Sequence, residues 1–211
     1  MIVDISDRIR SKLEEKDAAR ERSLAMSREV VRNCRTAMFN IHKGKFEKAA
    51  ALLESSGRSV KEFGFLLEKH PDVYHSGFVE HAQQEFVECS IVFELLSHGT
   101  ETDRIPGPEE LEVEYSAYLN GLGDVNGELR RHILDLIRKE KTSEAEKFLD
   151  VMEDIYSCLM MFDFPDAMTR GLRHKTDTTR SILERTRGDV STAIRQLKLE
   201  NAMRDFERKL D

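Results

Sequence analysis

The sequence has no tryptophan, four prolines and three cysteines in 211 residues. The cysteines (Cys34, Cys89 and Cys158) lie far apart, so neither a zinc cluster nor a disulfide framework is predicted. No run of about 18 apolar residues is present, which argues against a membrane-spanning helix. The first ten residues also lack the basic start and apolar core of a signal peptide. We therefore expect buried thiols, a cytoplasmic location and no membrane partner.

The apolar residues that are present follow a helical period. Hydrophobic residues make up 39% of the chain and charged residues 35%, a balance typical of long helices with broad solvated faces. Apolar side chains recur mostly at spacings of three, four and seven, and Gly, Pro, Ser or Thr stand at the boundaries. The spacing predicts helices over 4–42, 45–69, 73–97, 108–141, 142–161 and 167–210, with Gly188 as a candidate break in the last.

No strand pattern competes with these helices, and no period of 20 to 50 residues indicates a solenoid. The stretch 99–110 has two prolines and two glycines and is too short for a domain linker, so it predicts a loop within a domain. We expect an all-α protein: one domain over 1–211 that forms a bundle of six or seven long antiparallel helices.

The stretch YLNGLGDVNGELRR (118–131) places three glycines inside a helical pattern, where each costs about 1 kcal/mol relative to alanine. Asp124 and Glu128 are four residues apart, so both carboxylates project from one helix face. Glycine beside that face lets a backbone, a metal ion or a phosphate approach closely. The stretch is therefore a candidate for a functional site.

A second acidic pair, Glu85 and Glu88, lies in QEFVEC, with His81 one turn earlier. If the two helices are adjacent, four carboxylates converge, and they cannot all stay ionised without a cation between them. Hard divalent ions such as Mg²⁺ or Mn²⁺ take oxygen ligands. Two solvated acidic faces would explain the same spacings, and a lone histidine at such a position is usually a structural hydrogen-bonding group.

Basic residues concentrate in two regions despite a net charge of −7. The first 48 residues hold twelve Lys and Arg against eight Asp and Glu, and 170–195 holds seven against three. Both excesses are consistent with solvated helix faces or with contacts to nucleic-acid phosphates. The candidate phosphate contacts are Arg28, Arg32, Arg35, Arg170, Arg173 and Lys175.

Three segments resemble motifs of the translin and translin-associated factor X (TRAX) family. Residues 118–131 are similar to Y-L-x-G-x-x-D-L-T-G-E-L-x-R and depart from it at Val125 and Asn126. QEFVEC resembles the factor X motif Q-E-Y-V-E-A, and MSREVVRNCRTAMFNIHKG (26–44) resembles L-S-R-D-I-x-x-x-S-K-R-x-I-F-x-L-H-R. The matches occur in the family's order and are closer to the catalytic factor X than to translin.

The resemblance implies that Glu85, Glu88 and Asp124 are catalytic and that Glu128 joins them in binding Mg²⁺, with Mn²⁺ as an alternative ion. It also implies subunits that assemble into a closed octameric shell around RNA. We expect a homo-octamer, with a mixed assembly that includes a translin-like subunit as the other arrangement.

The function predicted from these motifs is a metal-dependent endoribonuclease that cleaves single-stranded RNA or a nicked passenger strand. A non-catalytic translin-like protein that binds RNA or single-stranded DNA is the main alternative, and an oligomeric scaffold that binds only proteins is a third. The sequence has no Glu-x-x-His pair for a di-iron bundle, no phosphate-binding G-x-x-x-x-G-K-[S/T] loop and no G-x-S-x-G motif.

Overall fold

The computed structural model describes residues 1–100 and 104–209, and these residues contain helices and no strand. This confirms the predicted all-α fold. The six long helices are α1 (Ile2–His42), α2 (Phe46–Leu67), α4 (Gly77–His98), α6 (Tyr115–Arg138), α7 (Thr142–Leu159) and α9 (Leu172–Glu207). Three single-turn helices join them: α3 (Pro71–Tyr74), α5 (Pro108–Leu111) and α8 (Asp166–Thr169).

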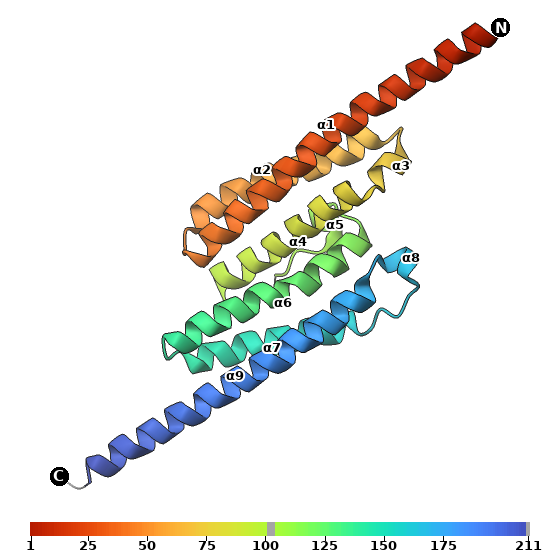
Figure 1. Cartoon of the computed structure of the whole chain (residues 1–211). Helices are drawn as coiled ribbons and strands as arrows, with labels where there is room; N and C mark the ends of the chain where they lie inside the picture. The colour runs from red at the N-terminus through yellow and green to blue at the C-terminus, as the bar shows by residue number, and fades with distance from the viewer. Residues whose placement is uncertain (101–103, 210–211) are drawn as a thin grey trace.

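Helices α4 and α6 form the centre of the bundle. Helix α4 packs on α1 and α2, whereas α6 packs on α7 and α9, and the two central helices pack on each other (Figure 1). Both are therefore covered on two sides, and the buried residues Val87, Val92, Leu129 and Ile133 belong to the shared core. The two predicted acidic pairs thus lie on adjacent helices.

The predicted helix over 108–141 is wrong at its start. The chain forms one turn of helix, α5, then takes a left-handed conformation at Glu112 (φ 54°) and enters α6 at Tyr115. Left-handed backbone is uncommon for a residue with a side chain, so composition gives no signal for this break. Helix α6 then continues through the two departures from the family motif, Val125 and Asn126, both buried, and Asn126 Nδ2 donates to the Met152 carbonyl oxygen of α7.

The boundaries of two other predicted helices also change. The helix expected from residue 73 starts at Gly77, because α3 forms a separate turn before it. The last helix breaks at Gly171, which is left-handed at φ 89°, and not at Gly188. It is regular to Glu207, and the predicted end at residue 210 lies outside the described residues, as do positions 101–103 of the predicted loop.

The two terminal helices extend beyond the bundle at opposite ends (Figure 1). Their apolar side chains there are exposed: Ile2, Ile5, Ile9 and Leu13 on α1, and Leu199, Met203 and Phe206 on α9. All three cysteines are free thiols; Cys34 and Cys89 are buried as predicted, whereas Cys158 is only partly buried. In the described part of the chain, no helix is both long and apolar enough to cross a membrane.

Candidate functional site

Helices α4 and α6 approach closely where Gly121 faces α4. A Cβ atom at Gly121 would lie 2.7 Å from the Gln84 carbonyl oxygen and 2.9 Å from the Val87 side chain. No larger residue fits between the two backbones, which gives this glycine of the motif a packing role. The contact brings the turn of α4 that carries Glu85 and Glu88 against the turn of α6 that carries Asp124.

Four carboxylates meet at this crossing. Glu85, Glu88 and Glu128 line a cleft of about 200 Å³, together with Cys34, Arg35, Met38, Phe39, Cys89 and Arg131. Burial, followed by the charges of Asp124, Glu85 and Glu128, raises the pKa of Glu88 to about 8. The two helices are therefore adjacent, and the charges of Asp124, Glu85 and Glu128 all act on Glu88.

Both oxygens of Asp124 are occupied by side chains of neighbouring helices. Lys175 of α9 donates from Nζ to Oδ1 at 2.6 Å, and Gln84 of α4 donates from Nε2 to Oδ2 at 2.5 Å. The Lys175 stem reaches Asp124 across Gly123, where a Cβ atom would lie 2.4 Å from the lysine Cγ. Gly123, which lies at a variable position of the family motif, thus makes room for a side chain, whereas Gly121 makes room for a backbone.

Glu128 has a buried histidine partner at the end of α1. His42, whose side chain is 4% exposed, lies with Nε2 2.5 Å from Glu128 Oε2, and Arg131 is 3.7 Å from the same oxygen. The hydrogen bond from His42, more than the nearby charges, lowers the pKa of Glu128. Glu128 is therefore held as an oriented, ionised carboxylate, in contrast to Glu88.

The residues of this cleft match a hard divalent cation in donor type, because all four candidate ligands are carboxylates. Burial is the main cause of the raised pKa of Glu88, and the negative charges of Asp124, Glu85 and Glu128 add to it. Among the described residues, however, no three His, Cys, Asp or Glu side chains are close enough together to hold a metal ion. Asp124 is held by Lys175 and Gln84, and Glu128 by His42, so these carboxylates would have to change partners to bind one.

The predicted basic residues divide into two groups. Arg28, Arg32 and Arg35 line a groove of about 490 Å³ between α1 and the start of α4, and Arg35 also lines the carboxylate cleft. Across residues 1–100 and 104–209, none of these three guanidinium groups forms an ion pair or a hydrogen bond. They are therefore available to an anionic ligand.

The other three predicted basic residues are paired within the chain. Arg170 binds Glu80 and the His75 carbonyl oxygen, Arg173 lies 3.1 Å from Asp163, and Lys175 holds Asp124. The Arg173 pair is almost fully exposed and stabilises little. The composition of 170–195 indicated a basic surface that could bind phosphates. In the structure, the three candidate residues of this segment are already paired with acidic side chains.

Sequence reasoning missed His42 and Gln84 as partners of the acidic residues, and it assigned Lys175 to RNA alone. His42 and Gln84 both fall inside motifs that resemble the family, and this was the available signal. His81, expected beside Glu85, does lie near it, with Nε2 3.8 Å from Glu85 Oε1, but it is half exposed and lines the basic groove.

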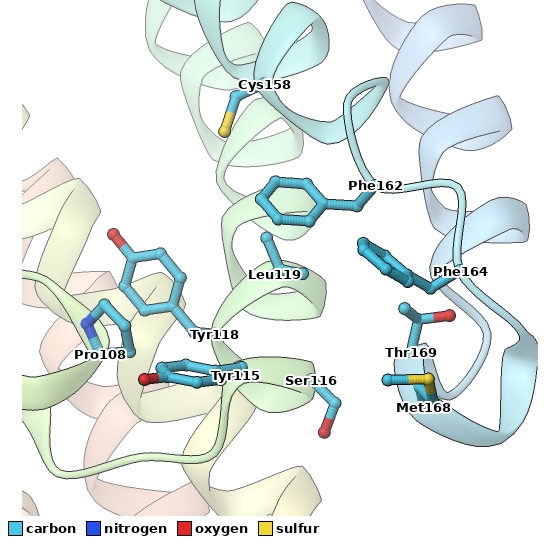
Figure 2. A pocket seen from close by; sticks show the side chains of 10 residues that line it. All are labelled: Pro108, Tyr115, Ser116, Tyr118, Leu119, Cys158, Phe162, Phe164, Met168 and Thr169. Carbon is cyan, nitrogen blue, oxygen red and sulfur yellow. The ribbon is translucent and has the colours of Figure 1, made fainter.

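A separate apolar pocket of about 450 Å³ lies between the start of α6 and the segment before α8. Figure 2 shows the rings of Tyr118, Phe162 and Phe164 around Leu119. The described lining residues carry no carboxylate or amine, so this pocket lacks the groups that phosphodiester cleavage requires.

Comparison with known proteins supports the family resemblance. The chain is 36% identical over 195 residues to the uncharacterized protein MJ0175 of Methanocaldococcus jannaschii, covering 91% of this chain and 84% of that protein. It matches the structure of AfC3PO in a duplex RNA complex with a TM-score of 0.78 and 34% identity, covering 89% of this chain and 95% of that one.

Two further solved structures match over the same share of this chain. The crystal structure of AfC3PO matches with a TM-score of 0.78 and 35% sequence identity, and the match covers 95% of the AfC3PO chain. Apo-NeC3PO gives the same TM-score at 21% identity, is covered to 96% and supports the fold alone. These structural neighbours are of translin/TRAX type. No protein-family model matches the chain.

Proposed function

The chain belongs to the translin/TRAX-type C3PO family, and on that premise we propose that it is a metal-dependent endoribonuclease of the factor X subtype. Its substrate is single-stranded RNA or a nicked strand. The observation that carries this proposal is a cleft lined by Glu85, Glu88 and Glu128, in which Glu88 also feels the charge of the nearby Asp124. Such a concentration of like charge costs stability, and active sites are where proteins tolerate that cost.

Glu85, Glu88, Asp124 and Glu128 would hold Mg²⁺, with Mn²⁺ as an alternative ion. When bound, the ion lowers the pKa of a coordinated water and offsets negative charge on the leaving oxygen. The chain itself orients the ligands: Gln84 fixes one oxygen of Asp124, and His42 keeps Glu128 ionised. Partners of this kind tune metal ligands from outside the first coordination sphere.

The groove formed by Arg28, Arg32 and Arg35 supplies a path for the RNA backbone. Its arginines are unpaired within the described residues, and Arg35 lies at the boundary between the groove and the carboxylate cleft. A phosphodiester backbone bound along α1 would therefore lead into the cleft. Contacts of this kind bind phosphates without reading sequence.

We propose a homo-octameric shell as the working assembly, with a translin-like partner subunit as the alternative composition. The exposed apolar side chains at the end of each protruding helix support association, because apolar side chains gathered on a surface often mark protein–protein contacts. A shell would place the cleft inside an enclosed volume that admits only RNA able to enter it.

A second function, metal-independent binding of RNA or single-stranded DNA, has one observation in its favour. Asp124 and Glu128 already have partners in the chain, so the carboxylates are satisfied in part without a metal ion. A binding protein would keep the arginine groove and would need no cleavage chemistry.

The purified protein should be incubated with end-labelled single-stranded RNA in Mg²⁺, with an EDTA control and a parallel binding measurement. We expect cleavage that EDTA abolishes. Binding without cleavage would favour the second function, and loss of both at low salt would favour a protein scaffold.

A further inference from the structure

We propose that Lys175 is a competing cation for the carboxylate cleft, which must leave Asp124 before a divalent ion can use that ligand. This inference rests on the proposed function. In this role, Lys175 sets the Mg²⁺ concentration at which the carboxylates bind the ion. Its position in a basic segment had instead predicted a contact with an RNA phosphate.

The lysine ammonium binds one of the two carboxylate oxygens through which Asp124 would bind a metal ion. Lys175 Nζ lies 2.6 Å from Asp124 Oδ1, and about a quarter of the lysine side chain is exposed. The ammonium charge also acts on Glu88, against the three carboxylates that surround it. One side chain from α9 thus balances part of the charge that α4 and α6 bring together.

The fold reserves space for this side chain. The stem of Lys175 crosses α6 at Gly123, and a Cβ atom there would lie 2.4 Å from the lysine Cγ and 3.1 Å from its Cδ. Alanine at this position would displace the stem and move the ammonium from its present position. A glycine in the middle of a helix costs stability, so its presence here is explained by the crossing lysine.

Asp124 would keep its orientation without the lysine. Gln84 donates to the other carboxylate oxygen, Oδ2, at 2.5 Å. Removing the Lys175 charge therefore leaves a ligand that is still positioned and a cleft that is more negative. Both changes favour a divalent cation, because the attraction between opposite charges grows as the local negative charge rises.

Two variants and two controls separate this role from a structural one. Lys175→Met keeps most of the stem and removes the charge, and Gly123→Ala displaces the stem without altering a charged residue. Gly127→Ala introduces the same methyl group four residues later on α6, where nothing lies within 4 Å. Arg173→Met removes a charge from the same helix as Lys175, at an exposed ion pair with Asp163.

The experiment titrates Mg²⁺ alone into each full-length protein, without RNA, and follows thermal melting and calorimetric heat. Circular dichroism and light scattering check that each variant keeps its fold and assembly. We expect Lys175→Met and Gly123→Ala to lower the half-saturating Mg²⁺ concentration by at least about threefold. Gly127→Ala and Arg173→Met should keep the wild-type value.

Saturation of Lys175→Met at the same Mg²⁺ concentration as wild type, or at a higher one, would overturn the inference while leaving the proposed metal site intact. Mg²⁺ binding that appears only in Lys175→Met or Gly123→Ala would support it most strongly. Absence of Mg²⁺ binding in every protein would overturn both the inference and the proposed function.

Discussion

Gly121 of α6 lies directly against the backbone of Gln84 of α4, so closely that a Cβ atom would come within 2.7 Å of the Gln84 carbonyl oxygen. This contact sets the separation of the two central helices. Because Glu85 follows Gln84 and Asp124 follows one turn after Gly121, the same contact sets how closely the acidic residues of the two helices meet. Helix packing and the candidate chemistry therefore depend on one small residue.

Gly121→Ala should lower the free energy of unfolding by about 1–3 kcal/mol, the usual range for overpacking a core. Gly127→Ala is the matched control, because its methyl group meets nothing within 4 Å. It should raise stability by up to about 1 kcal/mol through helix propensity. Urea unfolding of both variants measures the difference, and equal stabilities would contradict a packing role for Gly121.

The metal-free protein should lose stability as pH rises from about 5 to 9. The pKa of Glu88 is about 8 in the folded protein, against an ordinary value of 4.5. The stabilisation that comes from holding the proton is therefore complete below pH 4.5 and lost as pH rises through 8. A tenfold change in proton affinity is about 1.4 kcal/mol, so a shift from 4.5 to about 8 makes the full loss of the order of 5 kcal/mol.

Glu88→Gln tests this assignment, because glutamine keeps the size of the side chain and cannot ionise. In EDTA, the variant should match wild type near pH 5 and exceed its melting temperature at pH 9. Parallel pH profiles for the two proteins would show that another group causes the trend.

Arg32→Ala should weaken RNA binding with little effect on stability, because its guanidinium group has no partner in the described residues. Loss of one phosphate contact should reduce the slope of log affinity against log salt by about 1, for any RNA sequence. Arg173→Ala serves as the control, since Arg173 is already paired with Asp163. Fluorescence anisotropy at several salt concentrations in EDTA measures the slopes, and identical slopes would exclude this groove as the RNA path.

Ile9→Asp combined with Leu13→Asp should reduce the size of the assembly. Both side chains lie in the first part of α1 and are more than half exposed. Burying each would contribute about 1.5–3 kcal/mol to association, and a charge there would oppose it. Light scattering would detect the smaller species, and Ser11→Asp on the opposite face of α1 should leave the size unchanged. An unaltered mass in the double variant would place the subunit contacts elsewhere.

The sequence predicted the long helices and the shared face within each acidic pair because both depend on local spacing. Glu85 and Glu88, like Asp124 and Glu128, lie on one face through helix geometry alone. The family resemblance then implied that Glu85, Glu88 and Asp124 act together, whereas the adjacency of the two helices was left as a condition. The breaks were less predictable: Glu112 takes a left-handed conformation without being glycine, and Gly188 stays helical between the buried Leu183 and Val190.

The partners of the carboxylates could not be predicted in this way. His42 is 86 residues from Glu128, and Lys175 is 51 residues from Asp124. No periodicity links positions so far apart, since only the packing of α1 and α9 against the central helices brings them together. For the same reason, composition could not separate the unpaired Arg28, Arg32 and Arg35 from the paired cations after residue 170.

The most direct test of the central claim is the single-turnover rate of RNA cleavage in Mg²⁺ by Glu88→Gln, beside wild type and Glu94→Gln. Glu94 lies on the same helix and pairs with His98, away from the cleft. Glu88→Gln should lose at least about 100-fold in rate while its assembly stays intact, because a metal ligand is removed. The melting temperature of each protein, measured in the cleavage buffer, excludes unfolding as the cause. Equal cleavage by Glu88→Gln and Glu94→Gln would contradict a carboxylate metal site at this crossing of α4 and α6.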